Sequence, residues 1–216
     1  MSDEPTQPVE SMRKNPVQGR AWRTVRTIFE ATFQILDRDG EKSLTTNRVA
    51  ERAGFSIGTL YQYFPSMESI LLAMIDLERR RIVADLERLL TEVEVSDIHP
   101  HEITRRFVRA LIDVFGVGGR ARRALLKRAW MLDQTPPSLA AVRQVTERTR
   151  TAFVRRAHPD FPAPDAATMF VVSRSVLGAI RSAVLEDTGL PGTPEFEDAL
   201  VRLSVALLES PCPTPR

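Results

Sequence analysis

Apolar residues recur along most of the chain at intervals of three and four residues rather than at every second position. That spacing gathers them on one side of an α-helix, whereas a strand with one buried face needs strict alternation. Valine and isoleucine nowhere form the alternating runs, bounded by turn residues, that are typical of strands. The pattern therefore predicts an all-α fold.

Proline, glycine and capping residues divide this pattern into about nine helices. The predicted helices cover 18–38, 46–53, 57–64, 67–93, 100–115, 120–133, a seventh that contains 139–153, an eighth over 165–187, and a ninth that opens at Thr193 and contains 196–207. Residues 1–17 and 211–216 carry several prolines and few apolar residues. We therefore expect a disordered arm at the start of the chain and a disordered tail at its end.

Two short helices in the first third of the chain have the dimensions of a helix-turn-helix. Thr45 is placed to cap the first helix, and Gly54 ends it after two turns. Ser56 is placed to cap the second, which Pro65 stops. Two helices of about eight residues joined by a short turn with glycine favour a DNA-binding motif. A helical hairpin without a nucleic-acid role also fits the spacing.

The second short helix has a polar and nearly uncharged outer face. Leu60 and Phe64, four residues apart, can pack inward, and the remaining surface holds Gly58, Thr59, Tyr61, Gln62 and Tyr63. A solvated helix normally carries lysine and glutamate there. Hydroxyl groups suit phosphate oxygens, and a glutamine amide can pair with adenine through two hydrogen bonds. This composition favours the DNA-binding interpretation.

A longer pattern surrounds the helix pair. It reads Ile28-x-x-Ala31-Thr32-x-x-Ile35-Leu36-x-x-x-Gly40, then Leu44-Thr-Thr-Asn-Arg-Val-Ala50, then Ala53-Gly54-Phe-Ser56-x-Gly58-Thr-Leu-Tyr61-x-Tyr63-Phe64-Pro-Ser66-x-Glu68-x-Ile70-Leu71. This pattern resembles the TetR family of bacterial transcriptional regulators. The resemblance implies an N-terminal three-helix DNA-binding domain with a helix-turn-helix, followed by a C-terminal helical domain that binds an effector and dimerises. It predicts an arm over 1–17, the DNA-binding domain over 18–65, the second domain over 66–210 and a tail over 211–216.

The resemblance also implies roles for single residues. Thr46 and Tyr61 correspond to phosphate contacts, Thr59 to a contact at a phosphate or a base edge, and Asn47 and Gln62 to positions that read bases. Arg48 fits either role, whereas Gly54 makes the turn and Val49, Ala50, Leu60 and Phe64 pack the domain. The predicted DNA-contacting residues are Thr45, Thr46, Asn47, Arg48, Ser56, Ile57, Gly58, Thr59, Tyr61, Gln62 and Tyr63.

The sequence departs from the family pattern at Met67, where many members have a lysine that reaches the DNA backbone. Two interpretations follow. Met67 either leaves one phosphate contact unmade or packs against the first helix.

The predicted second domain carries large apolar residues on the helices that surround an effector cavity in the family. The candidate effector-binding residues are Phe107, Leu111, Phe115, Trp130, Met131, Phe153, Met169 and Arg174. Ordinary core packing also explains the apolar members of this set. Arg174 lies among apolar residues of its helix, so it points to solvent, forms an ion pair or meets a polar group of an effector.

The eighth predicted helix is apolar over a face too wide for one neighbour. Together with the resemblance, this width predicts a homodimer formed through the last two helices. The candidate dimer residues are Val176, Ala179, Ile180, Ala183, Leu200, Leu203 and Leu207.

Composition and charge set limits on other functions. The net charge of +2 is too small to indicate nucleic-acid binding, although 13–67 holds nine basic and five acidic residues. A single cysteine, Cys212, excludes a disulfide within the chain. No apolar run approaches the length of about 18 to 20 residues that a membrane span needs, and the first residues lack the apolar stretch of a signal peptide. We expect a cytoplasmic protein with no membrane partner.

Candidate catalytic or metal-binding groups are scarce. His99-Pro-His101-Glu102 is the only cluster of metal-ligand types, and it lacks a third ligand and the HExxH spacing, so it indicates a helix start. No nucleophile elbow or pair of acids stands out. We therefore expect no metal, no cofactor and no catalysis.

The leading hypothesis is a homodimeric regulator that binds double-stranded DNA at a palindromic operator. It predicts repression that ends when a small-molecule effector of unknown identity binds the second domain. An alternative is a DNA-binding interaction adaptor without an effector. An all-helical enzyme is disfavoured because no catalytic set is evident.

Overall fold

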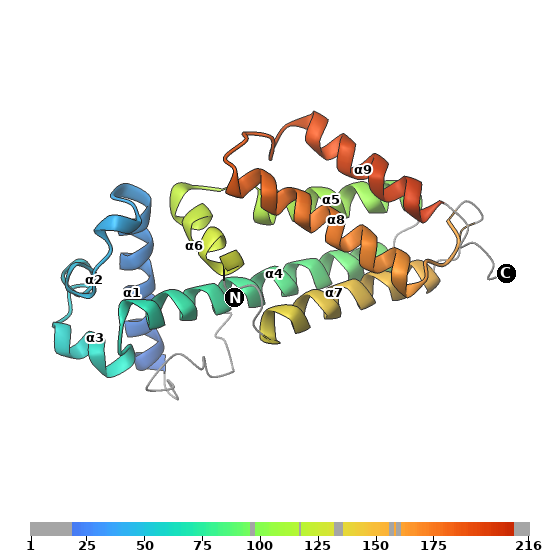
Figure 1. Cartoon of the computed structure of the whole chain (residues 1–216). Coiled ribbons are helices and arrows are strands. Elements are labelled where there is room, and N and C mark those ends of the chain that lie inside the picture. The colour runs from blue at the N-terminus through green and yellow to red at the C-terminus, as the bar shows by residue number, and fades with distance from the viewer. Residues whose placement is uncertain are drawn as a thin grey trace. The chain divides into compact units, whose positions relative to one another are not determined.

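The computed structural model describes residues 19–95, 98–116, 118–131, 136–155, 158 and 161–209. Within these ranges the chain forms nine α-helices, one short 3₁₀ helix (η1) and no strand (Figure 1). The elements are α1 (Gly19–Arg38), η1 (Glu41–Ser43), α2 (Thr46–Ala53), α3 (Ile57–Tyr63), α4 (Met67–Val95), α5 (Pro100–Phe115), α6 (Arg120–Met131), α7 (Pro136–Arg155), α8 (Ala166–Leu185) and α9 (Pro194–Leu208). The predicted all-α class is confirmed.

The helix bounds agree with the sequence pattern to within about two residues. The predicted disordered arm over 1–17 and the tail over 211–216 lie outside the described residues, as does Cys212. Local signals explain the agreement, since a helix start or stop depends on residues only a few positions away. Thr193, for example, accepts a hydrogen bond from the Phe196 amide and caps α9 with Pro194 in its first turn.

By compactness the chain divides into two units. The first contains the described residues up to Arg80 together with Gly119–Met131, and the second contains Arg81–Gly118 and the residues from 132 onward. Helix α4 contributes its first half to one unit and its second half to the other, and α6 belongs to the first unit. The spacing of the apolar residues in α6 does not by itself indicate that this helix packs with the N-terminal helices.

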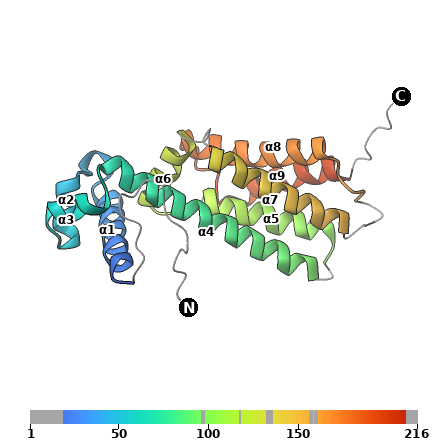
Figure 2. The same cartoon turned by 90° about the horizontal axis from the view of Figure 1, so that it is seen from below.

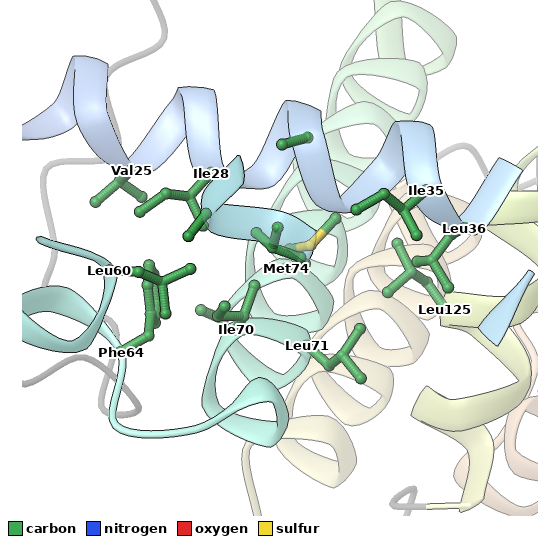
Figure 3. Packing of buried hydrophobic residues seen from close by; sticks show 14 of the residues in the cluster. Val25, Ile28, Ile35, Leu36, Leu60, Phe64, Ile70, Leu71, Met74 and Leu125 are labelled. Atoms are coloured by element: carbon green, nitrogen blue, oxygen red, sulfur yellow. The ribbon is translucent and has the colours of Figure 1, made fainter. Parts of the chain in front are cut away.

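The core of the first unit is made by α1, α2, α3, the start of α4 and α6. Figure 3 shows Val25 and Ile28 of α1 facing Leu60 and Phe64, with Ile70 beside them. Leu125 of α6 closes the same cluster near Leu36. Because all these side chains are buried, the first unit has its own hydrophobic core.

Polar contacts also hold α6 in the first unit. The Asp37 carboxylate at the end of α1 accepts a hydrogen bond from the Ala121 amide at 3.3 Å. Arg128 pairs with Glu41 of η1 at 2.8 Å and also with Glu68 of α4. These contacts join elements that are far apart in sequence, so no local pattern could have predicted them.

In the second unit, α5 packs against α8 and α9, and α7 packs against α8. Figure 2 shows these four helices side by side. Leu90, Ile180 and Val201 are among its fully buried side chains. From the middle of α5, Arg105 and Arg109 form ion pairs with Glu197 in the first turn of α9 at 3.1 and 2.8 Å.

By length and composition, α8 qualifies as a helix that could cross a membrane. This finding corrects the expectation that no segment approaches that length. About a third of the apolar window of α8 is buried within the chain. A single helix of this kind is weak evidence for a membrane span, because core helices of soluble proteins meet the same criteria.

Candidate nucleic-acid interface

The helix pair α2 and α3 is held in place by its inward side chains. Val49, Ala50, Leu60 and Phe64 are buried, as their predicted packing role requires. The Phe64 ring lies 5.7 Å from that of Phe29 on α1, centroid to centroid. Packing of these inward side chains fixes the orientation of α3, so its outer face points away from the core.

Two predicted DNA contacts also cap the helices of the pair. Thr45 accepts a hydrogen bond from the Arg48 amide at 3.3 Å at the start of α2. The Ser56 hydroxyl accepts one from the Thr59 amide at 3.1 Å and lies 2.9 Å from the Thr59 hydroxyl. Between the helices, Gly54 adopts φ 73°, a left-handed conformation that glycine takes without strain.

The two predicted phosphate contacts lie next to each other. The Thr46 and Tyr61 hydroxyls are 3.3 Å apart, within hydrogen-bond distance, although 15 positions separate them in the sequence. Each hydroxyl can still accept or donate a further hydrogen bond. The structure thus brings together two hydroxyl groups, one from each helix of the pair.

Most of the remaining predicted contacts lie at the surface. Asn47, Ile57, Gly58, Tyr61 and Gln62 are exposed. Thr59 is partly buried, and Tyr63 is partly buried because it packs against the core of the first unit. None of the side chains of α3 carries a charge.

Arg48 has partners within the chain. Its guanidinium donates to the Asp39 carboxylate at 2.8 Å and to the Ser43 carbonyl at 3.1 Å. Both partners belong to the connection between α1 and α2. Arg48 therefore holds this connection in the unbound chain, a role that the sequence pattern did not indicate because Asp39 lies nine positions away.

Met67 is partly buried and packs against the core cluster of the first unit. This observation supports the interpretation of Met67 as a packing residue. The helix it opens is capped by Ser66 and Ser69, each of which donates its backbone amide to the other's hydroxyl at 3.1 Å. Serine here takes the place that glutamate has in the usual capping box.

The candidate effector-binding residues do not fall in one unit. Trp130 and Met131 lie on α6 in the first unit, where Trp130 is buried and Met131 is 83% exposed. The other six lie in the second unit, where Leu111 and Met169 are buried and Phe107, Phe115, Phe153 and Arg174 are partly buried.

The Arg174 guanidinium lies over the exposed Phe170 ring, 5.3 Å from its centroid. Arg174 thus makes a cation–π contact at the surface, which is none of the three environments considered from the sequence.

The candidate dimer residues divide by burial. Val176, Ile180, Ala183 and Leu200 are buried within the single chain, so their side chains form part of its own core. Their assignment to the dimer interface stays a prediction, and burial within the single chain does not favour it. Leu203 is exposed, and Ala179 and Leu207 are partly buried. When a helix is apolar on several sides, its sequence does not show which of these sides packs against the rest of the same chain and which stays exposed.

His99 caps α5, so the His99–Glu102 segment is a helix start, as the sequence pattern indicated. Its Nδ1 accepts a hydrogen bond from the His101 amide at 3.2 Å. Its ring also packs edge-on against His158 at 4.7 Å between centroids. Among the described residues, no group of three or more histidine, cysteine, aspartate or glutamate side chains is arranged to hold a metal ion.

The fold and this interface together define a helix-turn-helix protein. A family model for "Bacterial regulatory proteins, tetR family" matches residues 28–74. Over 63 residues the chain is 38% identical to the HTH-type transcriptional repressor KstR of Mycolicibacterium smegmatis, a match that covers 29% of this chain and 31% of that protein. The matched segment is thus about a third of this relative's length.

Solved structures extend the likeness to most of the chain. A TetR-family transcriptional regulator of Mesorhizobium loti superposes with a TM-score of 0.62 at 17% identity, over 89% of this chain and 96% of that one. The multidrug binding protein EbrR, in complex with imidazole, gives a TM-score of 0.57 at 16% identity, over 88% and 98%. These two structures show the fold. The family model and the KstR match show that residues 28–74 resemble the DNA-binding segment of the tetR family of bacterial regulatory proteins.

Proposed function

We propose that this chain is a transcriptional regulator that binds double-stranded DNA through α2 and α3. The exposed, uncharged polar face of α3, with the Thr46 and Tyr61 hydroxyls 3.3 Å apart beside it, carries the proposal. Hydroxyl groups contact phosphates and set the position of the protein, whereas Gln62 and Asn47 offer amides to base edges. We propose that the chain acts by binding rather than by catalysis, in the cytoplasm.

The proposed sense of regulation is repression. KstR is named a repressor, and its similarity to this chain lies in the DNA-binding segment. EbrR is a multidrug binding protein crystallised with a small molecule, and its fold resembles this chain over most of its length. We propose by analogy that an effector binds the second unit and lowers DNA affinity, which requires that it bind the two states of the protein unequally.

The proposed partner is a second copy of the chain. The exposed side of α8 carries the uncharged residues Val171, Gly178, Ser182 and Leu185, and that of α9 carries Ala199, Leu203 and Ala206. Their spacing of three, four and seven residues makes one stripe on each helix, and the small side chains allow close approach. These exposed stripes replace the four buried candidates as the proposed dimer surface. Two copies related by a twofold axis would read a palindrome with half-sites about 34 Å apart or somewhat more.

Footprinting of the full chain on DNA flanking its own gene tests DNA binding, and a small-molecule screen for release from the footprint tests the effector. We expect a protected, palindromic sequence and at least one compound that removes protection. Protection that no compound alters would support the adaptor alternative. A selection from random DNA would then show whether the chain prefers any other sequence. If neither the flanking DNA nor the selection gave sequence-specific binding, the proposed function would be contradicted.

A further inference from the structure

Ile57 places an apolar side chain on the otherwise polar outer face of α3. Its side chain is 37% exposed, whereas Leu60, three positions on, is fully buried. Ile57 belongs neither to the core cluster of the first unit nor to the partly buried residues that pack against it. Within the chain, therefore, more than a third of the Ile57 side chain stays open to a partner.

Among the described residues of α2 and α3, Ile57 and Tyr61 are the two large exposed apolar side chains. The other exposed apolar residues of the first unit, Phe33, Leu72 and Met131, lie on α1, α4 and α6. The Tyr61 hydroxyl already lies beside that of Thr46. Ile57 is thus the one purely aliphatic group that the helix pair offers to a partner.

The residue after Ile57 leaves this part of the face open. A Cβ added to Gly58 would meet no atom closer than the Ser56 hydroxyl, at 3.8 Å. Residues four apart share a row on a helix, so Ile57 lies in line with Tyr61, and Gly58 in line with Gln62. The Ile57 side chain therefore lies next to Gly58, where the missing side chain lets the helix backbone approach a partner closely. The Gln62 side chain lies one helical turn further along.

Building on the DNA-binding role proposed above, we propose that Ile57 contacts the 5-methyl group of a thymine in the major groove. The thymine methyl is the apolar group that an unmodified base pair presents in that groove. Contact with it would cover the exposed side chain of Ile57, which no carbonyl oxygen, ring nitrogen or amino group on the base edges can do as favourably. Since Gln62 suits adenine, the arrangement predicts a half-site in which this thymine lies near the adenine read by Gln62.

The experiment removes the methyl group without changing base pairing. An operator selected from random DNA is prepared with deoxyuridine in place of each thymine of a half-site in turn, and affinities are measured for the full-length protein, Ile57→Ala and Ile57→Val. For the unmodified protein, one replacement should lower affinity about four- to fifteenfold, the effect of losing one or two buried carbon groups. Ile57→Ala should bind the thymine operator more weakly by a similar factor and show no further loss with deoxyuridine. Ile57→Val should keep part of the sensitivity.

Leu72→Ala is the matched control, because Leu72 is equally exposed at 37% but lies on α4. It should retain both the affinity and the sensitivity of the unmodified protein. Two results would overturn the inference: a protein insensitive to every thymine replacement, or Ile57→Ala with undiminished sensitivity. Failure to select any sequence would instead overturn the DNA-binding role on which the inference rests. Thermal unfolding of each variant confirms that the first unit remains folded.

Discussion

The hydroxyl and amide groups of α3 are expected to have separable effects on DNA binding. Gln62→Ala should relax discrimination at one base position at a cost of about 1 to 3 kcal/mol, because it removes a base contact. Tyr61→Phe should weaken binding to all sequences alike, because phosphates carry no sequence information. Binding measured across a set of operator variants tests both. A Gln62→Ala protein with unchanged preference and affinity would remove Gln62 from the base-reading residues.

Gly58 is a residue where stability and binding should respond in opposite directions. The helix has room for a Cβ there, 3.8 Å from the Ser56 hydroxyl, and alanine is a better helix former than glycine by about 0.5 to 1 kcal/mol. Gly58→Ala should therefore stabilise the protein slightly but weaken DNA binding, since the added methyl group fills the gap beside Ile57. Denaturant unfolding and operator titration measure the two effects. Unchanged or tighter binding would show that the backbone does not approach DNA closely at this point.

Between elements, the contact of α5 with α9 should depend on pH. The Arg109 guanidinium, and after it that of Arg105, hold the pKa of Glu197 below its ordinary value. A carboxyl group with a lowered pKa in the folded state stabilises the protein above its unfolded pKa, about 4.3. That contribution is lost as the pH falls through the lowered value. The contact therefore stabilises the protein near neutral pH and fails in acid.

Glu197→Gln should lower stability at neutral pH and make unfolding less dependent on pH below about 4.3. Glu195→Gln is the control, because Glu195 is exposed in the same first turn of α9. Denaturant unfolding between acid and neutral pH compares the variants. An identical pH dependence in Glu197→Gln and the unmodified chain would exclude this carboxylate as a source of acid sensitivity.

The first turn of α6 depends on an acceptor from α1. Asp37→Ala removes the partner of the Ala121 amide and should destabilise this turn by about 0.5 to 1 kcal/mol, the effect of losing a helix cap at the surface. Asp37→Asn keeps an acceptor oxygen and should retain most of the stability. Hydrogen exchange of the Ala121 amide measures the change. Equal protection in Asp37→Ala and the unmodified chain would show that the contact does not stabilise α6.

At the scale of the whole molecule, dimerisation is proposed to depend on exposed residues of α8 and α9. Leu203→Glu should yield monomers and lower operator affinity by a factor of about 100 or more, because two linked half-sites bind far more tightly than one. Val154→Glu is the control, since Val154 is 43% exposed on α7 and Leu203 is 41% exposed on α9. Sedimentation velocity and operator titration test this prediction. A dimer that survives Leu203→Glu would reject the proposed surface.

Local sequence signals determined the helices and the DNA-binding motif. Thr45, Gly54, Ser56 and Pro65 place the ends of α2 and α3, and each acts within about four residues through capping or backbone conformation. The period of the apolar residues likewise separated the inward side chains of α3 from its outer face. These features could be predicted because the interactions that create them lie within one helical turn.

The tertiary structure decided which faces meet. The Asp37 contact with Ala121 spans 84 positions, and it belongs to a set that groups α6 with the N-terminal helices. Arg48 binds Asp39 although it is exposed, and Val176 and Ile180 face the core of their own chain. Helical periodicity reports that a residue lies on an apolar side, but not which partner covers that side. That choice depends on how distant helices pack together, which no local pattern records.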